Sequence, residues 1–213
     1  MGNRLLSLLI TVRTEKKLKA SKIIQVGDPP PGFVNLTYDP VSIADNLGVQ
    51  IEKVDLDSLT ERMELIDDRD VGHRVALMKH SAASICVNEE EIRKNARLSL
   101  AIEAIGIEHA ADAFAIRCWP EFQSDLGFST CLAFSWLTNS GLSVACEGDV
   151  LGALTMLISQ ELSGHCPTIL DFVALDSDKD LIAFWHCGAS PACLADDAGC
   201  RYIKYPSPVE LFD

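Results

Sequence analysis

The pattern of apolar and polar positions in the first half of the chain predicts short strands that alternate with helices. Residues 22–27 and 49–54 carry the β-branched and alternating apolar positions of strands, and a proline-rich segment follows the first of them. Three stretches have the apolar spacing and the capping residues of helices: 42–47, 57–65 and 89–105. This βαβα order predicts a Rossmann-like α/β fold, in which helices cover a parallel sheet.

The second half of the chain is denser in apolar residues. Its expected elements are strands at 114–119, 143–146, 168–175 and 181–186 and helices at 130–139 and 150–162. Asp149 is placed to cap the second of these helices, and the polar residues 176–180 form a turn between the last two strands. Because the pattern changes near residue 110, we expect a Rossmann-like domain over residues 1–110 and part of a separate mixed α/β domain over 111–213.

The charge balance and the cysteines limit the classes of partner and the compartment. The 18 Lys and Arg residues against 31 Asp and Glu residues give a net charge of −13, which argues against nucleic acid and anionic membrane surfaces. The apolar run at 5–12 is too short to span a bilayer, which takes about 20 residues, and we expect a helix there. The eight cysteines mostly lie in apolar segments, which favours reduced, buried thiols and a cytoplasmic protein.

Three polar residues stand in surroundings that are unusual for them. Glu147 follows an apolar run and precedes glycine, where a strand gives way to a helix. Asp171 lies inside an otherwise apolar strand, and a buried carboxylate there would need a partner, a proton or a metal ion. His186 ends the last predicted strand. Since the carboxyl ends of strands are where α/β sheets bind ligands, these residues form a candidate site for a divalent ion such as Mn²⁺.

Each of these residues also has an ordinary structural explanation. Glu147 fits an ion pair, Asp171 fits the outer face of an edge strand, and His186 fits a hydrogen-bonded core histidine. Zinc is a weaker alternative, because the chain has no Cys-x-x-Cys motif. Catalysis through Cys118 is weaker still, because no base is near it in sequence.

Several motifs together resemble the L-fucose isomerase-like family of the L-fucose/L-arabinose isomerase superfamily. They are Cys118-Trp119-Pro120-Glu121-Phe122-Gln123, Ala145-Cys146-Glu147-Gly148-Asp149-Val150, the segment 152–156, Asp171-Phe172 and His186-Cys187-Gly188. The resemblance covers roughly residues 20–205. It implies that residues 1–110 form the middle domain of a sugar isomerase and that 111–213 form part of its catalytic domain.

The resemblance implies a metal-dependent aldose–ketose isomerase that acts on a monosaccharide through an enediol(ate). Glu147 and Asp171 then serve as metal ligands and as the acid/base pair, and His186 serves as a further Mn²⁺ ligand. Members of the family are longer and bring another metal-site histidine from a later segment. The expected protein is therefore a poor isomerase by itself, completed by a homo-oligomer or a complementing chain. Alternatives are a non-catalytic sugar-binding remnant, one subunit of a split isomerase, or an unrelated doubly wound binding domain.

Overall fold

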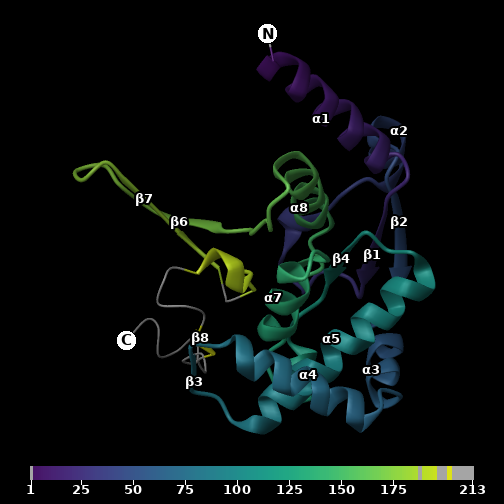
Figure 1. Cartoon of the computed structure of the whole chain (residues 1–213), viewed down its shortest axis with the longest axis vertical. Coiled ribbons are helices and arrows are strands. Elements are labelled where there is room, and N and C mark those ends of the chain that lie inside the picture. Colours follow the sequence, from purple (N-terminus) through teal and green to yellow (C-terminus); the bar gives the residue numbers. More distant parts are fainter. Residues whose placement is uncertain (1, 187–188, 196–200, 203–213) are drawn as a thin grey trace.

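A four-stranded parallel sheet forms the centre of the molecule (Figure 1). The computed structural model describes residues 2–186, 189–195 and 201–202. In spatial order the strands are β2 (Gln50–Val54), β1 (Lys22–Val26), β4 (Ala113–Ile116) and β5 (Ser143–Ala145). Every pair in this order is parallel, and the chain therefore has the predicted α/β fold.

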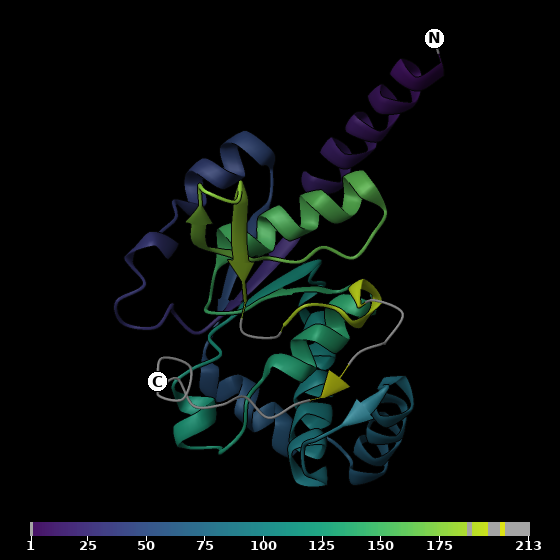
Figure 2. The ribbon, with the colours of Figure 1, turned by 90° about the vertical axis from the view of Figure 1, so that its left-hand side faces the viewer.

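Strands β1, β4 and β5 are largely apolar and buried because helices cover both faces of the sheet (Figure 2), whereas the edge strand β2 is partly exposed and carries polar residues. Ile24 and Phe114 face the helices α3 (Leu56–Glu64), α5 (Glu89–His109) and α7 (Cys131–Asn139). Their sequence neighbours Ile23 and Ala113 face the opposite side, in a core shared with α2 (Pro40–Leu47) and α8 (Val150–Ser163). The period of two along each strand thus divides its side chains between two cores.

The sheet continues across residue 110, where the sequence pattern predicts one domain to end and another to begin. β1 pairs with β2 on one side and with β4 on the other, so strands from both predicted units share one sheet. The order β2-β1-β4-β5 also means that successive strands are added first to one side of β1 and then to the other. The carboxyl ends of β1 and β4 therefore flank a topological switch point, which is the usual ligand-binding edge of such sheets.

Helix α4 (Asp68–Ser81) was not predicted from the sequence. Asp67 caps it by accepting a hydrogen bond from the Arg69 amide at 2.7 Å. Val71, Val75 and Met78 are buried against α5, at the spacing of one helical face. The signal was present in the sequence, but it is short and follows directly on the four charged residues at 67–70, which read as a polar loop.

Two elements project from this body (Figure 1). One is α1 (Gly2–Leu18), whose outer part carries exposed leucines, and no helix in the described part of the chain is long and apolar enough to cross a membrane. The other is the antiparallel hairpin of β6 (Asp171–Asp176) and β7 (Leu181–Trp185). Its apolar side chains are 47–63% exposed: Phe172, Val173, Leu175, Leu181, Ile182, Phe184 and Trp185.

The remaining elements are short, and they complete the described structure without entering the central sheet. They are the 3₁₀ helices at Val34–Leu36 and Ala192–Leu194, α6 (Glu121–Ser124), and the paired strands β3 (Ser84–Ile85) and β8 (Arg201–Tyr202). The structure describes six of the eight cysteines, and none of these six is in a disulfide. Cys118 and Cys146 are buried, as predicted, whereas Cys131 and Cys166 are half-buried and Cys86 and Cys193 are exposed.

The cap at the start of α8 offers a direct test of the fold. Asp149 accepts a hydrogen bond from the Gly152 amide at 2.8 Å, as the sequence predicts. We expect Asp149→Ala to lower the free energy of unfolding by about 1 kcal/mol, because one amide at the helix start loses its partner. Urea denaturation measures this loss, and Asp149→Asn, which keeps the acceptor oxygen, should recover most of it.

Candidate active site

The three residues singled out in the sequence line one cavity of about 330 Å³. Glu147 lies just after β5, Asp171 is the first residue of β6, and His186 directly follows β7. The other lining residues are Phe33, Asn35, Leu36, Cys146, Asp149 and Ile169. The cavity thus lies at the carboxyl edge of the central sheet, and the expected convergence of these three residues on one cavity is confirmed.

His186 connects the hairpin to the end of β5. Its side chain is only 7% exposed, and its Nδ1 lies 3.2 Å from an Asp171 carboxylate oxygen. Its Nε2 lies 2.9 Å from the sulfur of Cys146, which is buried next to Glu147. A carboxylate accepts and a thiol donates, so a neutral ring with its proton on Nδ1 satisfies both contacts.

Asp171 differs from its expected environment. The sequence suggests a buried carboxylate, but the side chain of Asp171 is 63% exposed. The reason is that the hairpin extends away from the sheet, so the apolar neighbours of Asp171 are exposed as well. Asp171 is therefore a solvated carboxylate at the cavity rim, with His186 as its partner.

Glu147 is held in an uncommon backbone conformation. Its φ is +62°, in the left-handed region, and Gly148 follows with φ +69°. The Gly148 amide donates a hydrogen bond to the carbonyl of Ile116 at 3.0 Å, which ties this turn to the end of β4. A Cβ at Gly148 would lie 3.2 Å from the Pro29 nitrogen, so the turn also packs closely on the loop after β1. Non-glycine residues in this region often mark functional sites.

The donor groups suit a hard divalent ion such as Mn²⁺ in chemical type, since carboxylates and an imidazole share one cavity. Within the described residues, however, no group of three or more His, Cys, Asp or Glu side chains is arranged to hold a metal ion. His186 directs its two ring nitrogens at Asp171 and Cys146 instead. It would have to exchange one of these contacts to bind an ion.

The sequence reasoning missed the contribution of the loop after β1. Phe33, Asn35 and Leu36 form one wall of the cavity. The signal was the proline-rich segment that follows the first strand, because loops at the carboxyl ends of neighbouring strands meet at one edge. Cys146 was expected only as a small buried residue, and its contact with His186 was not expected. Cys187 and Gly188 of the third motif lie outside the described residues.

Comparison with known proteins finds similarity to curated proteins that share one name. No family model matches the chain. Curated proteins named sulfoquinovose isomerase from Priestia aryabhattai and Priestia megaterium are each 35% identical to it over 198 residues. One from Alkalicoccus urumqiensis is 32% identical over 196 residues. This chain is similar to sulfoquinovose isomerases.

The match to the sulfoquinovose isomerases covers most of this chain but less than half of theirs. It includes 92% of the chain and 44% of each of these three proteins. The aligned relatives are sugar isomerases by name, in agreement with the class of enzyme that the motifs resemble. The more specific link to the L-fucose isomerase-like family remains a prediction.

Proposed function

We propose that this chain is the sheet-bearing part of a sugar isomerase that interconverts the aldose and ketose forms of sulfoquinovose or a closely related hexose. The main support is that Glu147, Asp171 and His186 line one cavity in a chain similar to sulfoquinovose isomerases. Two carboxylates and an imidazole at the edge of an α/β sheet have the chemical functions that a proton transfer between adjacent carbons needs.

The reaction moves a proton without a net change in oxidation state. In this proposal one of the two carboxylates, Glu147 or Asp171, removes the proton from C2 of the open-chain aldose, and an enediol(ate) forms. The proton then returns to C1, and the hydroxyl proton on O2 is exchanged for one on O1. The contact with His186 positions the Asp171 carboxylate at the cavity rim.

The proposal includes a divalent cofactor, Mn²⁺ or a similar ion, with Glu147, Asp171 and His186 among its ligands. When bound, such an ion supplies electrostatic stabilisation of the charge that develops on the sugar oxygens. Because the described side chains alone do not form a ligand set, we propose that further ligands come from the remaining length of the isomerase.

We propose that this remaining length, on the same polypeptide or on a second chain, covers the β6–β7 hairpin. The hairpin exposes apolar side chains on a long ribbon, and its two ends carry Asp171 and His186. A partner packed on the hairpin would therefore also close the candidate cavity and exclude water from it. A homo-oligomer is a further part of the proposal. A cytoplasmic location is also part of the proposal, since none of the six described cysteines is in a disulfide.

The test is an isomerisation assay with sulfoquinovose and D-glucose in the presence and absence of Mn²⁺. It compares this chain alone with the chain joined to the segments that complete the length of the Priestia megaterium relative. We expect turnover by the completed protein and a rate lower by about 10²–10³ or more for the chain alone, because positioned electrostatic contacts are missing. Equal turnover by the chain alone would contradict an incomplete site.

A completed protein that binds these sugars but converts neither would favour the second candidate, a non-catalytic sugar-binding remnant. The observation that favours this candidate is the arrangement of the described residues, in which His186 contacts Asp171 and Cys146. The matched control is the Priestia megaterium relative itself under the same conditions.

A further inference from the structure

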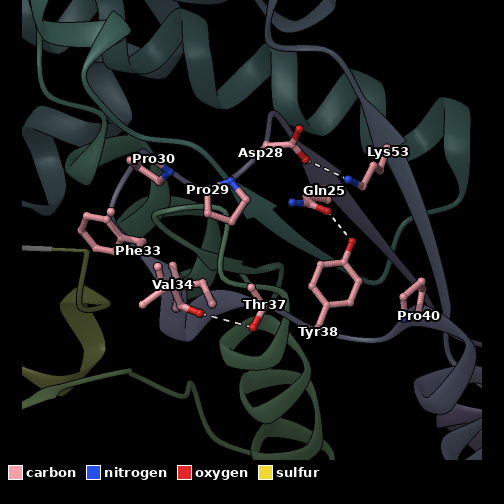
Figure 3. A pocket seen from close by; sticks show the side chains of 12 residues that line it. Gln25, Asp28, Pro29, Pro30, Phe33, Val34, Thr37, Tyr38, Pro40 and Lys53 are labelled. Atoms are coloured by element: carbon pink, nitrogen blue, oxygen red, sulfur yellow. Dashed lines mark hydrogen bonds and ion pairs between the residues drawn. The ribbon is translucent and has the colours of Figure 1, made fainter.

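A second cavity, of about 400 Å³, is lined largely by the loop that follows β1 (Figure 3). It is bounded by β1, by β2 and by the loop that leads into α2. Phe33 and Leu36 line both this cavity and the one that contains Glu147. The two cavities are therefore neighbours separated by one short segment of chain.

Gln25 lines this second cavity and has a side-chain atom that lacks a hydrogen-bond partner among the described residues. It lies on β1, is only 1% exposed, and lines the cavity. Its amide oxygen accepts a hydrogen bond from the Tyr38 hydroxyl. Its amide nitrogen is buried and has no hydrogen-bond partner in the described structure. A buried donor without a partner is costly, so such an atom points to a ligand that supplies an acceptor.

The charged groups at the cavity rim cancel each other. Lys53 Nζ lies 2.8 Å from an Asp28 carboxylate oxygen (Figure 3). This hydrogen bond raises the pKa of Lys53, and burial raises the pKa of the Tyr38 hydroxyl, so at neutral pH Lys53 is charged and Tyr38 is neutral. The rim thus offers both donors and acceptors but no net charge, which disfavours a strongly charged ligand.

The walls of the cavity are mostly apolar and rigid. Pro29, Pro30 and Pro40 line it together with Phe33 and Val34 (Figure 3). Proline rings hold the backbone in a fixed conformation, so the cavity is largely formed before a ligand arrives. Apolar walls with a few converging polar groups are typical of small-molecule sites in this range of volume.

We infer that this cavity is a second binding site, for a neutral polyhydroxylated molecule the size of a hexose, with Gln25 donating to one of its oxygens. The apolar faces of the ligand's ring would pack on the prolines, and its hydroxyl groups would meet Lys53, Asp28 and Tyr38. This inference is independent of the isomerase proposal. It concerns a different cavity, and it holds whether or not the chain is catalytic.

The site can be tested by NMR on the purified chain labelled with ¹⁵N. D-glucose is the probe, and the reporter is the side-chain amide of Gln25, assigned by its loss in Gln25→Leu. We expect a saturable shift of this signal during the titration, because the amide nitrogen gains an acceptor. Gln160 is the matched control, because its amide nitrogen donates to Gly141 and its oxygen accepts from Ser143, each at 2.9 Å. Its signal should not move.

The variants separate this site from the neighbouring cavity. Gln25→Leu should abolish the saturable shifts of the backbone amides of Val34 and Thr37, while Glu147→Gln should leave them unchanged. Circular dichroism shows whether each variant is folded. If Gln25→Leu does not fold, Tyr38→Phe, which should weaken binding by several-fold, replaces it. No saturable shift at Gln25 up to the highest D-glucose concentration would overturn the inference, as would saturable shifts confined to residues around Glu147.

Discussion

Glu147→Gln is expected to reduce the isomerase turnover of the completed protein by about 10²–10⁴-fold, because the amide cannot accept or return a proton. The substitution keeps the size of the side chain and its position on the turn between β5 and α8. Sulfoquinovose and the corresponding ketose would be separated chromatographically at several substrate concentrations. The loss should fall mainly on kcat, since the sugar can still enter the cavity.

The control for this prediction is Glu64→Gln. Glu64 is an exposed residue at the end of α3 and does not line the cavity that contains Glu147. The Glu64→Gln substitution removes the same charge from the protein as Glu147→Gln. An equal loss of turnover in both variants would therefore mean that the change in net charge, and not the loss of proton transfer, causes the effect. Full activity of Glu147→Gln would remove Glu147 from the proposed acid/base pair.

The β6–β7 hairpin is expected to make the isolated chain self-associate. Leu175 and Ile182 are paired across the strands and are 63% and 56% exposed. Replacing both by Thr keeps the preference for strand but removes apolar area worth about 1–2 kcal/mol for each side chain in a contact. Because about 1.4 kcal/mol corresponds to a factor of ten, we expect the double variant to have a dissociation constant for self-association at least tenfold larger. Sedimentation velocity measures this constant.

A matched control is Leu65→Thr. Leu65 is also highly exposed, at 78%, but lies at the end of α3, away from the hairpin in the sequence. If the hairpin is the contact surface, this variant should associate like the unmodified chain. A chain that remains monomeric at every accessible concentration would contradict the prediction.

Local pattern was enough to predict most of the sheet. Strands β1, β4 and β5 are short, largely apolar runs, and β2 alternates apolar and polar residues. The pairing order was not predictable in the same way, because it depends on which runs are adjacent in space. The apparent boundary near residue 110 reflects a change in apolar density along the chain, while β4 pairs with β1 across it.

The candidate site was predicted in position more accurately than in environment. Glu147, Asp171 and His186 do share a cavity, because strand ends and the returning hairpin meet at one edge. An apolar run looks the same whether another layer covers it or not, so the sequence could not show that Asp171 is exposed. The loop wall and the unsatisfied Gln25 amide depend on contacts between distant segments, which periodicity does not encode.

The left-handed backbone at Glu147 has an evolutionary consequence. A left-handed conformation costs an ordinary residue about 1–2 kcal/mol, whereas glycine adopts it freely and asparagine tolerates it. Selection for stability alone would therefore favour Gly or Asn at position 147. The proposed function therefore predicts that relatives which isomerise a sugar keep glutamate at this position despite its cost, and that relatives without catalysis drift toward glycine or asparagine.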